Sequence, residues 1–183
     1  VVAAVGGVAA AAGLTAYIAR GRTMSEGVHY ITTNDGVRLA YEVRGLGGPT
    51  VVLIHGWSGS RRYFDLNVEH LAQSCRVVLV DLRFHGDSDK PEWGFHVARL
   101  AADLNDLLSQ TWIGATKPAL LGTSLGCAVI WSYVELYGQA SVSKLIFVDQ
   151  ALFNGSNPHP HPHPHPLPVL TRTLALTSTL TLT

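Results

Sequence analysis

The chain has 183 residues, with 13 basic and 13 acidic side chains and no formal net charge. This length suits one domain of ordinary size with a buried core. The zero balance supplies no net field that would attract nucleic acid or anionic lipid, so we expect a small-molecule partner and no nucleic acid.

The first 18 residues contain no charged side chain and are followed by Arg20 and Arg22, as in a signal anchor. The segment is mostly alanine and glycine, and it is slightly shorter than the ~20 residues that cross a bilayer. A membrane anchor at 1–18 is therefore possible but not favoured, and we expect a cytoplasmic protein. Residues 1–23 are treated as a separate apolar segment, either an anchor or the edge of a fragment.

Strand patterns begin at His29, where apolar and polar residues alternate. The turn sequence Asn34-Asp35-Gly36 follows, and alternation resumes over 37–43, which predicts a hairpin. A β-branched and apolar run at 50–54 suits a strand that is buried on both faces.

The rest of the ordered region alternates between helices and strands. Helices are expected at 61–73, 95–110 and 125–137, and buried strands at 76–80, 119–122 and 145–148. This order predicts an α/β fold with a mainly parallel sheet, covered by helices, and an N-terminal antiparallel hairpin. Cys75 and Cys127 are too few for a disulfide framework, and we expect both to be buried thiols.

The composition changes after Asn154. Proline and histidine alternate over 158–166, and a threonine- and leucine-rich run follows at 171–183. Neither stretch can supply a core, so we assign 24–153 as the domain and 154–183 as a low-complexity, disordered tail. The histidines of the repeat lack spaced partners for a closed metal site, and no metal is expected.

The strongest chemical signal is the sequence GTSLG at 122–126, between a predicted strand and a predicted helix. Gly122 and Gly126 allow a sharp, strained turn that exposes the hydroxyl of Ser124 at a helix N-terminus. Backbone N–H groups and the helix dipole favour the negative charge that develops there during acyl transfer. Ser124 is therefore the candidate nucleophile.

A second signal is the sequence HGW at 55–57, directly after the first buried strand. This connection is where a serine elbow needs its second oxyanion donor, so the backbone N–H groups of Trp57 and Leu125 are the candidates. His55 and Gly56 are assigned to shaping the loop, and His55 is not expected to be the catalytic base.

The third signal is DLRFHGDSD at 81–89, directly after the next strand. Asp81, Arg83 and His85 are assigned to holding this loop together. In order and spacing, HGW, DLRFHGDSD and GTSLG resemble the α/β-hydrolase superfamily, and the resemblance covers roughly residues 29–150. Phe84 departs from the pattern, because the family usually has glycine after the arginine.

This resemblance implies a serine hydrolase, esterase-like, that acts on a small ester, thioester or amide through an acyl-enzyme on Ser124. Epoxide hydrolases of the family carry aspartate at the elbow, so the serine argues against epoxide chemistry. No metal or organic cofactor is implied.

The family's triad continues with an acid and a histidine after the nucleophile, and roughly a hundred further residues would be expected to carry them. Asp149, at the end of the last strand, is a weak candidate for the acid. No histidine after Ser124 lies outside the Pro-His repeat. We therefore expect an incomplete, C-terminally truncated α/β-hydrolase fold that is inactive in this form.

Two alternatives stay open. The chain could be a non-catalytic, truncated pseudoenzyme that at most binds a small ligand, or a haloperoxidase-like enzyme that uses the same serine framework.

Overall fold

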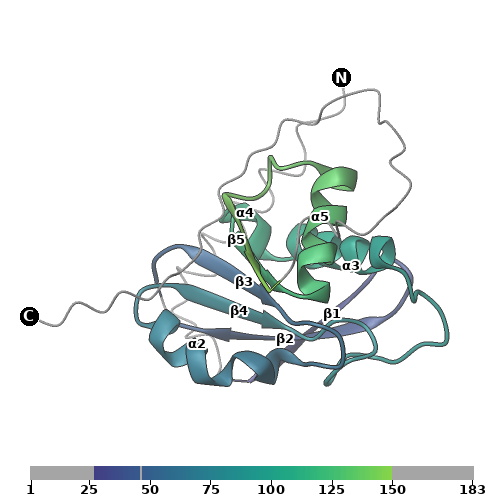
Figure 1. Ribbon diagram of the computed structural model, residues 1–183, viewed down its shortest axis with the longest axis horizontal. Coiled ribbons are helices and arrows are strands. Elements are labelled where there is room, and N and C mark those ends of the chain that lie inside the picture. The colour runs from purple at the N-terminus through teal and green to yellow at the C-terminus, as the bar shows by residue number, and fades with distance from the viewer. Residues whose placement is uncertain (1–26, 46, 150–183) are drawn as a thin grey trace, which may run out of the picture. The chain divides into compact units, whose positions relative to one another are not determined.

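The computed structural model describes residues 27–45 and 47–149 (Figure 1). The strands are β1 (Val28–Thr32), β2 (Arg38–Arg44), β3 (Thr50–Ile54), β4 (Arg76–Val80), β5 (Ala119–Thr123) and β6 (Lys144–Val148). The helices are the 3-10 helix η1 (Arg61–Phe64), α2 (Asp65–Ala72), α3 (Val97–Gln110), α4 (Trp112–Ala115) and α5 (Leu125–Tyr137).

The six strands form one sheet in the order β1-β2-β4-β3-β5-β6. β1 pairs with β2, and β2 with β4, in antiparallel register, whereas β4, β3, β5 and β6 run parallel. The predicted fold class is confirmed: the sheet is mainly parallel and begins with an antiparallel hairpin.

Helices cover both faces of the sheet, with α2 on one side and α3 and α5 on the other (Figure 1). The larger core cluster joins apolar side chains of α3 and α5 to the sheet, including Leu104, Val129 and Val52. The smaller cluster joins Phe64 and Val68 to the opposite face. β3 is buried at all five positions, as its uninterrupted apolar sequence predicts.

Some element ends differ from the sequence prediction by one or two residues, as in α3, which begins at Val97 rather than at 95. Three further local features also differ. The helix expected at 61–73 begins as the 3-10 turn η1, where the side chain of Ser60 accepts a hydrogen bond from the Arg62 N–H. The short helix α4 was not predicted, because four residues are too few to show helical spacing. Cys75 is only partly buried, whereas Cys127 is buried as expected, and both are free.

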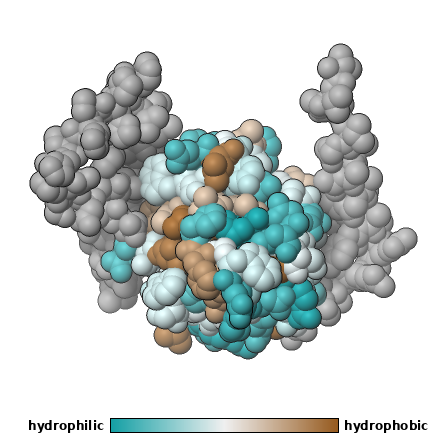
Figure 2. Space-filling model, turned by 90° about the vertical axis from the view of Figure 1, so that its right-hand side faces the viewer, coloured by the Kyte–Doolittle hydropathy of each residue, from teal (hydrophilic) through white to brown (hydrophobic). Residues whose placement is uncertain are grey.

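The surface of the described residues is mixed. Figure 2 shows one face, on which hydrophobic residues lie in small groups among hydrophilic ones. No helix in the described ranges is long and apolar enough to cross a bilayer. The segment at 1–18 and the Pro-His repeat both lie outside those ranges.

Candidate active site

The register of the sheet brings the sequence motifs together at one edge. Ile54 of β3 pairs with Val80 of β4 and with Gly122 of β5. The residues that follow these parallel strands must therefore emerge side by side at the carboxyl edge, where α/β sheets place their ligands. Ser124 is the first residue after β5, and Asp149 is the first after β6.

Ser124 has the strained backbone of a nucleophile elbow. Its φ is 49° and its ψ is −114°, a conformation that residues with a Cβ rarely adopt. The side chain is exposed at the N-terminus of α5, and the Ser124 carbonyl accepts the Cys127 N–H at 2.9 Å. Strain of this kind persists only where the surrounding structure holds it in place.

The two elbow glycines are required by close approach of the backbone. A Cβ on Gly126 would lie under 3.0 Å from the carbonyl oxygen of Ile54, at the end of β3. A Cβ on Gly122 would lie equally close to the backbone of Gly126, in the first turn of α5. The first turn of α5 can therefore pack between β5 and β3 only if both positions lack a side chain.

The turn after β3 lies directly against the serine. A Cβ on Gly56 would be 3.1 Å from the Cβ of Ser124. Trp57 follows this contact, and its side chain is exposed. Trp57 therefore follows the turn that contacts Ser124, and Leu125, the next residue after Ser124, is the first residue of α5.

His55 is fully buried and uses both of its ring nitrogens in hydrogen bonds. Its Nε2 accepts the Leu82 N–H at 3.0 Å, and its Nδ1 lies 2.7 Å from the carbonyl oxygen of Gly56, to which it can only donate. Burial lowers the pKa of His55, which favours the neutral ring that this pattern requires. Neither nitrogen is left to take a proton from Ser124.

Asp81 holds the loop after β4 to the start of η1. Its carboxylate accepts the Arg61 N–H at 2.6 Å and the Asp87 N–H at 2.9 Å, and it pairs with the Arg61 guanidinium. Arg61 is itself buried and also bonds to Glu42 and Asp87. Arg61 has no motif around it, so sequence reasoning gave it no role.

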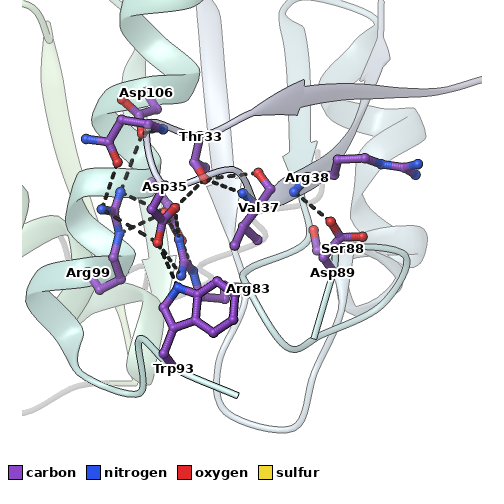
Figure 3. Close-up of polar contacts among 12 residues, drawn as sticks. Thr33, Asp35, Val37, Arg38, Arg83, Ser88, Asp89, Trp93, Arg99 and Asp106 are labelled. Atoms are coloured by element: carbon purple, nitrogen blue, oxygen red, sulfur yellow. Dashed lines mark hydrogen bonds and ion pairs between the residues drawn. The ribbon is translucent and has the colours of Figure 1, made fainter. Parts of the chain in front are cut away.

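Arg83 anchors the same loop to two distant parts of the chain (Figure 3). Its guanidinium donates to Asp35, in the turn between β1 and β2, and to Asp103 of α3, at 2.7–2.8 Å. Trp93 also donates to Asp35, and Arg99 donates to Asp103. The loop is therefore fixed at both ends, which positions Phe84 and His85.

Two of these carboxylates were missed from the sequence. Asp35 was taken only as a turn residue. Asp103 has a visible signal, since it shares the face of α3 that carries Leu100, Leu104 and Leu107, and a carboxylate on an apolar face needs a buried cation.

Asp149 remains a weak candidate for an acid. Its φ is 56°, its side chain is exposed, and it follows the residue whose carbonyl accepts the Ser124 N–H at 3.2 Å. Within residues 27–45 and 47–149, no group of three or more His, Cys, Asp or Glu side chains is placed to hold a metal ion.

Comparison with known proteins finds one family model, described as "alpha/beta hydrolase fold", that matches residues 49–174. The AB hydrolase superfamily protein YisY of Bacillus subtilis is 32% identical over 124 residues, which are 67% of this chain and 45% of that protein. A soluble epoxide hydrolase of Corynebacterium sp. is 32% identical over 125 residues, 68% of this chain and 42% of that protein.

Among solved structures, a putative aryl esterase from Burkholderia cenocepacia matches with a TM-score of 0.62 and 33% identity. The match covers 66% of this chain and 46% of that esterase. The chain thus spans less than half the length of each of these three proteins.

Proposed function

The chain belongs to the α/β-hydrolase family, whose model matches more than half of it, and on that premise we propose that Ser124 is the nucleophile of a serine hydrolase. The observation that carries the proposal is the strained, exposed serine at the N-terminus of α5. We assign the oxyanion donors to the backbone N–H groups of Trp57 and Leu125, which flank the serine.

The proposed reaction is acyl transfer from a small ester, thioester or amide. The Ser124 Oγ attacks the carbonyl carbon and loses its proton to a base. The carbonyl oxygen becomes an oxyanion, which accepts hydrogen bonds from the two backbone N–H groups. Collapse expels the alcohol, thiol or amine, which takes the proton. Water then attacks the acyl-enzyme, one of its protons passes through the base to the Ser124 Oγ, and the acid is released.

A small-molecule substrate agrees with the names of two similar proteins, an aryl esterase and an epoxide hydrolase. The serine at the elbow favours ester over epoxide chemistry. A haloperoxidase-like activity would use the same serine framework and stays open.

We further propose that the 183-residue chain turns over poorly by itself. Within the described ranges the Ser124 hydroxyl has no hydrogen-bond partner, and both nitrogens of His55 are occupied. A serine without a base is a poor nucleophile at neutral pH. The same observation supports the second candidate, a non-catalytic protein that only binds a small ligand.

Added imidazole should separate these proposals, because it can act as the general base if the protein supplies none. We expect the full chain to react with a fluorophosphonate probe at Ser124 on the order of 10²-fold faster with imidazole than without it. The labelled residue is identified by mass spectrometry. The label should vanish in Ser124→Ala and persist in Ser58→Ala, a control at an exposed serine of the neighbouring turn.

Each outcome decides one proposal. Rapid labelling of Ser124 without imidazole would show that the chain already contains a base and would overturn its proposed inactivity. A folded sample in which Ser124 stays unlabelled even with imidazole would overturn the assignment of the nucleophile and favour the non-catalytic candidate.

A further inference from the structure

An open hollow of about 360 Å³ lies between the turn after β3 and the loop after β4. Its lining side chains include Trp57, Phe84, His85 and Phe95. The proposed reaction uses the backbone N–H of Trp57 but none of these four side chains.

Three aromatic rings at this hollow, those of Trp57, Phe84 and Phe95, are partly or largely exposed to solvent. The rings of Phe84 and Phe95 stack in parallel, with centroids 4.3 Å apart and planes 4° apart. Phe95 is 70% exposed and Trp57 is 71% exposed. Aromatic side chains bury large areas when they can, so rings left exposed around a concave site favour an apolar planar ligand.

Phe84 adopts an unfavourable backbone conformation at this hollow. Its φ is 74°, a left-handed conformation in which glycine is favoured over any residue with a Cβ. The Phe84 N–H donates to the Asp89 carbonyl at 3.0 Å, and this bond helps to hold the turn in place. A strained residue at a concave surface is an expected feature of a functional site.

His85 adds one polar group to the hollow. It is 9% exposed, and its Nδ1 lies 2.8 Å from the Arg83 carbonyl oxygen, to which it can only donate. The Nε2 of the neutral ring is then an acceptor, and in the part of the chain that the structure describes it has no hydrogen-bond partner. The His85 ring packs edge-on against Trp57, with centroids 5.7 Å apart.

We propose that this hollow is a binding subsite for an aromatic group that carries a hydrogen-bond donor, such as a phenol ring. The ring stacks on the aromatic side chains, and its O–H donates to the Nε2 of His85. β3 separates β4 from β5 in the sheet, so the loop after β4 and Ser124 are two strand spacings apart, roughly 10 Å. A short linker within the substrate can therefore join the bound ring to a carbonyl group at Ser124. This connection to Ser124, unlike ring binding itself, rests on the proposed function.

Binding of 4-ethylphenol to the full chain, followed by ligand-observed NMR, tests the subsite. We expect 4-ethylphenol to bind about threefold or more tightly than 4-ethylanisole, which cannot donate, because hydrogen bonds contribute modestly in water. Phe84→Gly should weaken binding about tenfold through loss of the ring, and Phe95→Ala should weaken it similarly. His85→Phe should remove the preference for the phenol.

Tyr30→Ala is the matched control, because Tyr30 is an exposed aromatic residue on β1 outside the hollow, and it should leave binding unchanged. Phe84→Gly relieves a positive φ, so its unfolding midpoint should not fall below that of the wild type. Equal affinity for the two ligands, or unchanged binding in both phenylalanine variants, would overturn the subsite. Neither ligand has a bond for Ser124 to cleave, so this result and the labelling of Ser124 can fail independently.

Discussion

Replacing Arg83 with leucine should lower the free energy of unfolding by about 3–5 kcal/mol near pH 8. Arg83 is fully buried and donates four hydrogen bonds to Asp35 and Asp103. Among the described residues, leucine leaves the buried carboxylate of Asp103 with Arg99 as its one cationic partner. A buried carboxylate that loses part of its pairing is costly, because in the buried site no water replaces the hydrogen bonds that Arg83 donated.

The pH dependence of this variant follows from the two carboxylates. In the wild type, hydrogen bonds from Arg83 hold the pKa of Asp35 well below its usual range. The ionised Asp35 carboxylate therefore contributes its full stabilisation of the fold above about pH 4, and this contribution is lost as the pH falls through the lowered pKa. Burial raises the pKa of Asp103. Loss of Arg83 should raise that pKa further, so the variant gains stability as the pH falls and Asp103 takes up a proton.

Urea unfolding at pH 8 and pH 5 measures both effects. The difference between wild type and Arg83→Leu should be larger at pH 8 than at pH 5. Arg62→Leu is the control, because Arg62 is exposed and its ion pair with Asp65 spans 3.8 Å, so its loss should change stability by about 1 kcal/mol or less. A cost for Arg83→Leu no greater than that of Arg62→Leu would contradict the importance of the buried network.

Elements with strong local signals were predictable from the sequence. The apolar runs at 50–54 and 76–80 suit strands that are buried on both faces, and both strands have the predicted bounds in the structure. The long helix at 125–137 also has its predicted bounds, ending before Gly138. Because parallel strands place their carboxyl ends at one edge, strand order alone brought His55, Asp81 and Ser124 together.

Features that depend on contacts distant in sequence were not predictable. Asp35 and Arg83 are 48 positions apart, and Arg61 and Asp81 are 20 apart, so no local pattern pairs them. The stacking of Phe84 on Phe95 depends on where the loop after β4 is held, which the Arg83 bonds decide. The roles assigned to Ser124, Trp57, Leu125 and Asp149 stay predictions, since they concern chemistry rather than position.

Gly126→Ala should destabilise the fold by about 3 kcal/mol and abolish the imidazole-dependent probe labelling of Ser124. The added Cβ would lie under 3.0 Å from the carbonyl oxygen of Ile54, which is backbone and cannot rotate away. Either α5 moves away from β3, or the elbow changes its backbone. Both adjustments displace Ser124 from the turn at Gly56. The Ser124 hydroxyl and the Trp57 N–H then no longer lie in the relative positions that attack on one carbonyl group requires. Thermal and urea unfolding measure the first effect, and mass spectrometry of the labelled chain measures the second.

Gly47→Ala is the matched control, because no heavy atom lies within 4 Å of a Cβ at that position. Its stability should equal that of the wild type within about 1 kcal/mol, since alanine restricts the unfolded chain slightly more than glycine does. The close approach of α5 to β3, rather than glycine content, then explains the difference between the two variants. A Gly126→Ala protein as stable as Gly47→Ala would mean that α5 can shift freely, and the elbow would not be the rigid support that a strained serine requires.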